Sequence, residues 1–383
     1  MRISYIIMMI ILISCSNSEY KIENIDGYEV VTNNNIKKDI KINLNLLYEI
    51  KNSDNSIFSL KFPRDRFSLN SALDSSMNLF VVDNVDSKIM KFNNHGIFVK
   101  EFGGKGQGPG EFPASPVDLY IYKEKLYVID ENGRMTIFDL EGNFIEYRNN
   151  EVFSMRPRSL KVSDSTVFLT GEAWQGRWGT EEFKYGLAVF KCNIELTSGD
   201  MLYGDLKSFD IGKISPEFDD IYSTFNGNKL VIGANSKSEF KLFEYDKSGK
   251  KNREIIKKYN QIYREQESID GMKKALEKYS DRSGGMFKFE EPSKYKNSTG
   301  QIFIGPEGSV FVSIDESQID NDGQKFNVFN ELGIMMGTAI VKDFANFDLR
   351  SDKGYLIAAT SKVSNYAEEG KTDPVIKVYS MSF

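Results

Sequence analysis

The chain has 383 residues, of which 40% are hydrophobic and 27% are charged, and its formal net charge is −6. Nucleic-acid binding depends on an excess of basic side chains that displace counterions from phosphates, so this acidic balance argues against a nucleic-acid partner. A single histidine, His95, and two cysteines, Cys15 and Cys192, leave little material for histidine-dependent catalysis or a disulfide framework. Cys192 lies in an apolar alternating stretch and is expected to be a buried structural thiol.

The chain opens with an apolar run over residues 3–13. This run is shorter than the roughly 20 residues of a membrane-spanning helix and has the length of a signal-peptide h-region. Leu12-Ile13-Ser14-Cys15 resembles the lipobox of bacterial lipoproteins, in which cleavage precedes the cysteine and the cysteine is acylated. The resemblance implies a signal peptide over residues 1–14, lipidation of Cys15 and a polar tether over residues 15–40. An ordinary signal peptide that happens to contain a cysteine is the alternative.

Four similar segments organise the chain after the tether. Each has an apolar strand, a polar turn, a second strand, a turn with glycine and a third strand, and a weaker strand precedes it. Glycine suits the second turn because tight hairpins often require a positive φ. Four short strands per unit is the pattern of a propeller blade. The segments are 79–103, 126–148, 230–255 and 310–341, and their turn glycines are Gly96, Gly142, Gly249 and Gly333.

Two more divergent units, 158–204 and 347–383, bring the number of blades to six. The last unit stops after its third strand. Residues 41–51 contain a strand with no other partner, and as the outer strand of the last blade it would close the ring and remove two exposed edges. The sequence therefore predicts an all-β fold, a single six-bladed β-propeller over residues 41–383 whose last blade is closed by an N-terminal strand.

One segment departs from the strand pattern. Residues 260–282 have apolar side chains at a spacing of three to four, which indicates an amphipathic helix, and Ser283-Gly284-Gly285 provides a C-terminal cap. We predict a helical insertion between blades four and five. It would serve either as a cover for apolar surface or as a lid or docking helix.

Residues 101–147 resemble the NHL-type six-bladed propellers and, more narrowly, six-bladed propeller lipoproteins of Gram-negative bacteria, abundant in the Bacteroidota. The matching marks are Phe102-Gly103 with the run GKGQGPGEF, the strand LYVID, and Ile137-Phe138-Asp139 followed by Gly142. The resemblance implies a propeller exported to the cell envelope and anchored there by lipid, with the outer membrane as its location, but no particular activity. The glycine-rich run is followed by proline and a strand, so we predict an inter-blade crossover and not a dinucleotide site.

The sequence offers little catalytic chemistry. Propeller lyases depend on histidine, and His95 lies in a turn between strands, away from the axis. Lactonase-type propellers bind calcium on the axis, where the candidates would be Asp83, Asp130, Asp315 and Glu172. Aspartate at that blade position usually caps a turn through backbone amides. We expect no catalytic residue, no metal site and no cofactor; a lyase or lactonase-type hydrolase with an axial divalent metal is the alternative function.

The most distinctive composition lies in residues 171–186, inside an insertion of the third blade, which hold both tryptophans of the chain. Tryptophan and arginine are enriched in binding hot spots, and an indole face suits stacking on sugars. The indoles would either bind a ligand or plug the ring as part of the core. We predict a non-catalytic binding or scaffold module for an envelope protein, peptide or glycan. The candidate ligand-binding residues are Trp174, Arg177, Trp178, Tyr185, Arg156 and Arg158.

Overall fold

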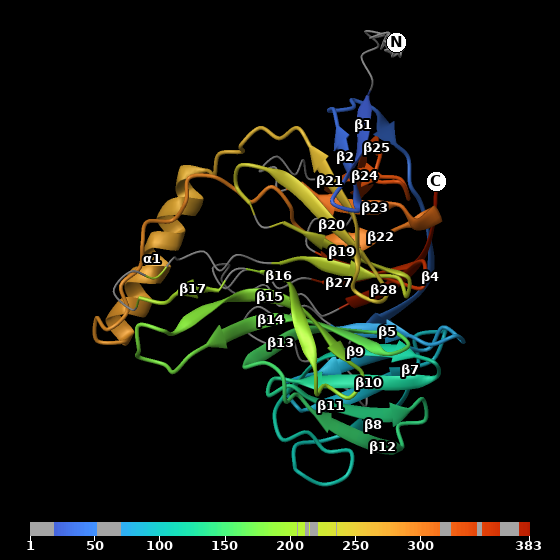
Figure 1. Ribbon diagram of the computed structural model, residues 1–383. Coiled ribbons are helices and arrows are strands. Elements are labelled where there is room, and N and C mark those ends of the chain that lie inside the picture. Colours follow the sequence, from blue (N-terminus) through green and yellow to red (C-terminus); the bar gives the residue numbers. More distant parts are fainter. Residues whose placement is uncertain are drawn as a thin grey trace, which may run out of the picture.

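The strands of the protein form six sheets that pack around one axis (Figure 1). This computed structural model describes residues 19–51, 70–204, 206–210, 214, 221–234, 236–314, 323–342, 347–360 and 375–383. Each sheet contains an antiparallel four-stranded blade whose strands are neighbours in the order of the chain, apart from the closing strand of the last one. The predicted six-bladed β-propeller is confirmed.

The blades follow one another along the chain from the innermost strand of each to the outermost. Blade one consists of β5 (Ser71–Leu73), β6 (Leu79–Asp83), β7 (Lys88–Phe92) and β8 (Phe98–Gly103). Blade two consists of β9 (Pro116–Tyr122), β10 (Lys125–Asp130), β11 (Arg134–Asp139) and β12 (Phe144–Asn149). Blade three consists of β13 (Met155–Val162), β14 (Thr166–Gln175), β15 (Lys184–Asn193) and β16 (Gly199–Gly204), and the short β17 (Lys207–Ser208) also pairs with β15.

The second half of the ring has the same order. Blade four consists of β18 (Ser223–Phe225), β19 (Lys229–Gly233), β20 (Phe240–Asp246) and β21 (Lys251–Lys257). Blade five consists of β22 (Ile302–Ile304), β23 (Val310–Ser313), β24 (Gly323–Phe329) and β25 (Met335–Lys342), with the 3-10 turn η1 (Pro306–Gly308) after β22. Blade six consists of β26 (Phe347–Asp352), β27 (Tyr355–Thr360), β28 (Val375–Ser382) and the N-terminal strand β4 (Asn43–Lys51).

The N-terminal strand closes the last blade as the sequence predicted. β4 pairs antiparallel with β28, with Lys51 opposite Val375 and Asn43 opposite Ser382. Its buried side chains Tyr48 and Ile50 pack in the core between blades six and one. The first strand of the ring and the last strand of the chain are therefore held in one sheet, and the ring has no open edge between its first and last blades.

Residues 20–40, which the sequence analysis assigned to the tether, contain three strands on the outer rim. β1 (Tyr20–Ile25) and β2 (Tyr28–Asn33) form a hairpin, and β2 runs parallel to the outer strand β21 of blade four. β3 (Asp39–Ile40) adds to β25 of blade five in the same way. The polar composition of the segment concealed these strands, because Val30 and Val31 are its only consecutive apolar pair and their partner strand lies more than 200 residues away.

The predicted turn glycines adopt the left-handed conformation. Their φ angles are 76° for Gly96, 77° for Gly142, 82° for Gly249 and 77° for Gly333. A Cβ on Gly142 would lie 2.6 Å from Cδ1 of Phe102 in the neighbouring blade. At this position glycine is needed both for the backbone angle and for the close approach of two blades.

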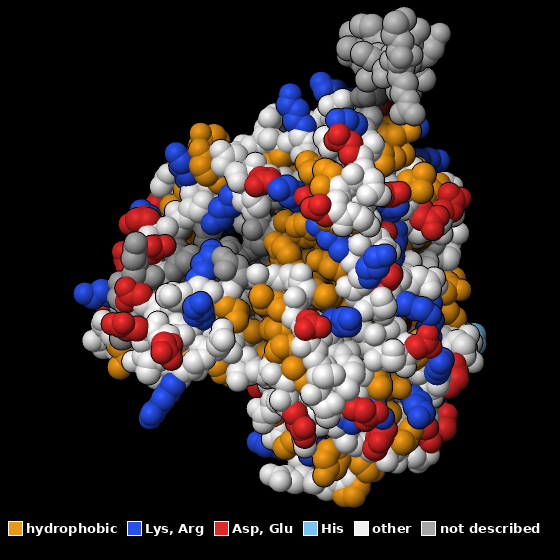
Figure 2. Space-filling view, viewed as in Figure 1, with side chains coloured by type: hydrophobic (Ala, Val, Ile, Leu, Met, Phe, Trp, Pro, Cys, Tyr) orange, Lys and Arg blue, Asp and Glu red, His pale blue; other side chains and the backbone are white. Residues whose placement is uncertain are grey.

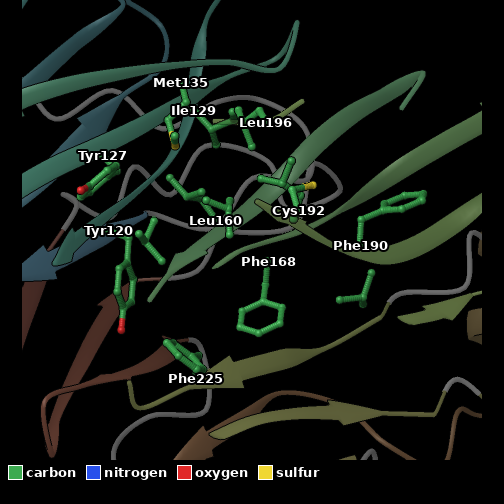
Figure 3. Packing of buried hydrophobic residues seen from close by; sticks show 14 of the residues in the cluster. Tyr120, Tyr127, Ile129, Met135, Leu160, Phe168, Phe190, Cys192, Leu196 and Phe225 are labelled. Atoms are coloured by element: carbon green, nitrogen blue, oxygen red, sulfur yellow. The ribbon is translucent and has the colours of Figure 1, made fainter. Parts of the chain in front are cut away.

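Apolar side chains fill the spaces between neighbouring blades. The largest cluster joins blades two, three and four, and it includes Phe168, Phe190 and Phe225 (Figure 3). Cys192 lies in this cluster and is buried, as predicted. Burial raises the pKa of its thiol to about 12, which keeps it protonated and unreactive at neutral pH.

The two faces of the propeller differ in the length of their loops. Short hairpin turns, such as residues 93–97 and 123–124, lie on one face. The other face, which we call the insertion face, carries the long connections that enter the innermost strands. Its largest insertion, residues 258–301, contains the predicted helix as α1 (Gln266–Arg282), which stands beside the blades (Figure 1). In the described part of the chain, no helix is long and apolar enough to cross a membrane.

Candidate functional site

The tryptophans lie at the end of a two-stranded ribbon on the insertion face. β14 and β15 have ten residues each and pair along their whole length, with Trp174 opposite Tyr185. Gly176, at φ 79°, begins the turn that carries Trp178. Because most other strands in the ring are shorter, the ribbon extends past its neighbours and presents its end on this face of the molecule (Figure 1).

Trp178 rests on two phenylalanines but remains open to solvent. Its ring centroid lies 5.1 Å from that of Phe183 and 5.1 Å from that of Phe209. Trp178 nevertheless keeps 58% of its surface exposed, and Trp174 keeps 37%. Both indoles are therefore surface side chains, and the interpretation as a buried plug of the ring does not describe them.

Glu172 is the centre of a polar cluster beside the indoles. It forms an ion pair with Arg158, and it accepts a hydrogen bond from the Tyr185 hydroxyl. Burial alone would raise the pKa of Glu172, but the hydrogen bonds from Arg158 and Tyr185, together with the charges of Arg158 and Arg156, outweigh burial and hold this pKa below its usual value. Burial, followed by the bond to Glu172, raises the pKa of Tyr185. Glu172 is thus an ionised carboxylate that holds two of the predicted ligand-binding side chains in place.

The two other predicted arginines are exposed. Arg156 lies opposite Glu172 in the pairing of β13 with β14, and Arg177 lies in the turn of the ribbon. The carbonyl of Arg177 accepts hydrogen bonds from the backbone and the hydroxyl of Thr180, at 3.2 and 2.8 Å, which order the turn. The structure therefore gathers all six predicted residues on three adjacent strands of one blade and the turn between two of them.

Phe183 and Phe209 were missing from the predicted set. Phe183 follows two glutamates in the turn, so its position gave no periodic signal. Phe209 lies in the next connection along the chain, where β17 pairs with β15 and the Phe209 amide bonds to the Phe183 carbonyl at 3.2 Å. Such a contact between two irregular segments has no signature in the sequence.

Another connection on the insertion face contacts the helical insertion. Ile214 pairs with Phe289, through hydrogen bonds of 2.8 Å to the backbone of Lys288 and Glu290. The Phe289 ring in turn lies 5.8 Å from Tyr279 of α1, which is exposed. Figure 2 shows the surface hollowed between α1 and the blades, with hydrophobic side chains gathered beside the hollow. Exposed aromatic side chains thus occur both on the ribbon and on the helix.

Two of the three aspartates considered as calcium ligands cap turns, as predicted. Asp83 accepts hydrogen bonds of 3.0 Å from the amides of Val85 and Asp86. Asp130 does the same for Asn132 and Arg134, at 3.0 and 2.8 Å. Asp315 lies outside the described residues. Within the ranges that the structure describes, no group of three or more histidines, cysteines and acids is placed to hold a metal ion.

A network of charged side chains, not predicted from the sequence, connects the inner strands. Asp118 of blade two is buried, and Nη1 of Arg350 from blade six lies 2.9 Å from its Oδ1. Nζ of Lys161 from blade three lies 3.3 Å from Oδ2, which also accepts the Leu160 amide at 2.7 Å. Arg350 reaches Asn70, beside blade one, at 3.0 Å. Four blades are thus joined near the axis.

Lys161 is fully engaged within this network. Besides Asp118, its ammonium contacts the Ser159 hydroxyl and the Leu160 carbonyl, each at 3.0 Å. Burial, followed by the nearby charge of Arg350, lowers its pKa to about 8. Because each donor of the ammonium is directed at an acceptor of the protein, Lys161 helps to hold neighbouring blades together.

A comparison with protein families agrees with this architecture. Residues 68–164 match the model of the DUF5128 family, described as a 6-bladed beta-propeller. The chain is a six-bladed β-propeller. The match covers all of blades one and two and the innermost strand of blade three. No curated protein matches the chain.

The chain also shows limited similarity to three solved structures. A Bacteroides fragilis protein whose name describes it as exported is 12% identical, with a TM-score of 0.48, over 91% of this chain and 99% of that one. A member of the DUF4221 family from Bacteroides vulgatus is 12% identical, with a TM-score of 0.46, over 89% and 98%. Regucalcin from Agrobacterium tumefaciens, a calcium-binding protein, is 8% identical, with a TM-score of 0.41, over 82% and 89%.

Proposed function

We propose that this propeller is a non-catalytic binding module of the cell envelope and that its ligand face is the insertion face around Trp178. The observation that carries the proposal is an indole that packs on Phe183 and Phe209 and still has 58% of its surface exposed. A side chain already held in place loses little conformational entropy when a ligand covers it. Most of the free energy gained from apolar contact with such an indole then contributes to affinity.

The side chains around the indoles suit an extended polar partner. The exposed guanidinium groups of Arg156 and Arg177 offer forked hydrogen-bond donors, and the indole faces offer apolar contact. Aromatic and guanidinium groups together recognise protein segments, peptides and sugar rings. We therefore propose an envelope protein, peptide or glycan as the partner.

The second part of the proposal is the location. The apolar run over residues 3–13 supports export, and the lipobox-like Leu12-Ile13-Ser14-Cys15 supports acylation of Cys15. Acyl chains at this cysteine would anchor the propeller to a leaflet, for which we propose the outer membrane.

A photocrosslinking amino acid at position 181, an exposed position in the turn that carries Trp178, tests the ligand face in living cells. The matched control places the same amino acid at Tyr147, an exposed aromatic residue on β12 of blade two. We expect irradiation to give a discrete adduct from position 181 alone, and digestion by protease or glycosidase then distinguishes a protein partner from a glycan. Equal labelling from both positions, or none from position 181, contradicts the proposal.

Intrinsic fluorescence gives an independent readout, because both tryptophans of the chain lie in the ribbon. Adding the purified adduct partner should change the emission of the wild-type protein. The change should be largely lost in Trp178→Phe and kept in Tyr147→Phe. An unchanged emission in the wild-type protein would show that the partner binds elsewhere.

A further inference from the structure

We infer that the propeller is held at the membrane by its rim, with the β1–β2 hairpin of blade four next to the lipid surface. This inference rests on the proposed acylation of Cys15 and adds the orientation of the domain and the side chains that meet the bilayer. It follows from the length of chain between the anchor and the first strand, from the attachment of that strand, and from its exposed side chains.

The chain between the anchor and the folded domain is short. β1 begins at Tyr20, only five residues after Cys15. A fully extended chain spans at most about 3.6 Å per residue, so Tyr20 lies within about 18 Å of the acylated cysteine. A tether that ended at residue 40, as the sequence suggested, would have allowed the propeller to turn any part of its surface to the membrane.

The hairpin moves with the propeller because several contacts fix it. β2 pairs with β21 over five residues, from Glu29 opposite Arg253 to Asn33 opposite Lys257. The Asn33 side chain is buried and bridges to blade five, where it accepts the Met335 amide at 2.8 Å and donates to the Gly333 carbonyl at 3.0 Å. A short tether on a fixed hairpin therefore orients the whole domain.

The side chains of β1 suit a membrane–water interface. All six of its residues are exposed, among them Tyr20, Ile22 and Ile25. Lys21 forms an ion pair with Glu23 at 2.7 Å, so the strand presents no net charge. Tyrosine is enriched at the level of the headgroups, and isoleucine gains from contact with the acyl boundary. The contact with lipid thus depends on apolar and aromatic groups.

The rim attachment leaves the flat faces of the propeller free. β1 is the sixth strand of its sheet counted from the innermost strand β18. Five spacings of about 4.8 Å place it roughly 24 Å from β18. The membrane then meets the outer edge of blade four, and a partner can approach the indoles of blade three without displacing the protein from the lipid.

Energy transfer to the bilayer tests the orientation. The full-length acylated protein is reconstituted in vesicles of phosphatidylethanolamine and phosphatidylglycerol that contain a rhodamine-labelled lipid. A donor dye is attached at Ile22→Cys on β1 or at Val99→Cys on β8, whose native side chains are 44% and 49% exposed. These outermost strands belong to blades four and one, which are opposite each other in a ring of six, and Cys192 is buried.

For a chain of this length the two positions are separated by roughly 50 Å. We expect several-fold more efficient energy transfer from position 22 than from position 99. Equal efficiencies, or a higher one at position 99, would overturn the rim orientation. Flotation of the unlabelled protein with the same vesicles separates the two proposals. If the protein floats but energy transfer is equal from the two positions, the anchor is supported and the rim orientation is wrong. If the protein does not float, both proposals are contradicted.

Discussion

Arg350 and Asp118 meet near the propeller axis, with Nη1 of the arginine 2.9 Å from Oδ1 of the aspartate, although 232 residues separate them in the chain. The arginine comes from blade six and the aspartate from blade two, so the pair joins blades that are not neighbours. β4 closes the ring at its outer edge, and this pair connects it at its centre. The ring is therefore closed twice, by backbone hydrogen bonds outside and by charges inside.

Asp118→Asn should destabilise the protein strongly. The substitution keeps the size of the side chain but leaves Arg350 and Lys161 as two cations without their shared counter-ion. Removing one partner from a buried ion pair typically costs about 3–5 kcal/mol of unfolding free energy. The measurement is the urea midpoint and slope.

Glu101→Gln provides the matched control, because Glu101 pairs with Lys88 at the exposed surface. Its effect should be about 0–1 kcal/mol. An Asp118→Asn protein as stable as the Glu101→Gln protein would mean that the axial network does not hold the blades together.

Lys161 should make the unfolding free energy of the protein depend on pH in the alkaline range. Burial and Arg350 lower its pKa to about 8 from an ordinary 10.5, although Asp118 and Asp352 also lie close and act in the opposite sense. Between these two pKa values the unfolded chain binds a proton here that the folded protein has lost. The unfolding free energy contributed by this group therefore rises with pH from about 8 to about 10.5.

Lys161→Met lacks this contribution, and comparing the two proteins cancels the titrating groups that do not interact with Lys161. Unfolding in urea at pH 7 and pH 10 should show that the unfolding free energy of the wild type rises with pH relative to that of the variant. The gain is limited to about 3 kcal/mol, at roughly 1.4 kcal/mol per pKa unit. If the difference in unfolding free energy between the two proteins were the same at both pH values, Lys161 would titrate with an ordinary pKa.

The blades could be predicted from the sequence, but the axial network and the rim hairpin could not. A blade is built from strands adjacent in the chain, so its alternation and its glycine turns lie within some 25 residues, as in 79–103. Asp118 and Arg350 become neighbours only when the ring closes. The available signal was a charged residue inside an otherwise apolar strand, as in PVDLYIY, which marks a buried charge without naming its partner.

The candidate site shows the same limit on prediction. The composition of residues 171–186 identified Trp178, because two tryptophans and an arginine lie within five positions. The support beneath it, Phe209, reaches the ribbon from another connection. Local composition can therefore indicate a candidate surface, while the contacts on which the exposed indole packs depend on the tertiary structure.

Ile50→Ala tests the closure of the ring by β4. Ile50 is 1% exposed and packs between the last and first blades, so its truncation leaves a cavity and should cost about 2–5 kcal/mol. Leu47→Ala, on the same strand but 45% exposed, should change stability by no more than about 0.5 kcal/mol. Thermal and urea unfolding check both values. If the two substitutions had equal effects, β4 would not be part of the core.

Asn33→Ala should loosen the rim hairpin. The substitution removes both side-chain bonds to blade five and leaves the Met335 amide without its buried acceptor, a loss of about 1–3 kcal/mol. Hydrogen exchange should therefore accelerate first in β1 and β2, while the inner strands keep their protection. Thr32→Ala, at an exposed neighbouring position of β2, serves as the control and should leave exchange unchanged. Uniform acceleration throughout the ring would contradict a local role for Asn33.

Cys15→Ser should release the protein from the membrane. Serine has no thiol to carry the lipid, so labelled palmitate should no longer be incorporated and the protein should move from the membrane fraction to the soluble fraction. The chain has only one other cysteine, Cys192, which is buried between blades. Cys192→Ala should therefore keep both the label and the membrane association. Label that persists in Cys15→Ser would place acylation elsewhere, and it would remove the short tether on which the orientation of the rim depends.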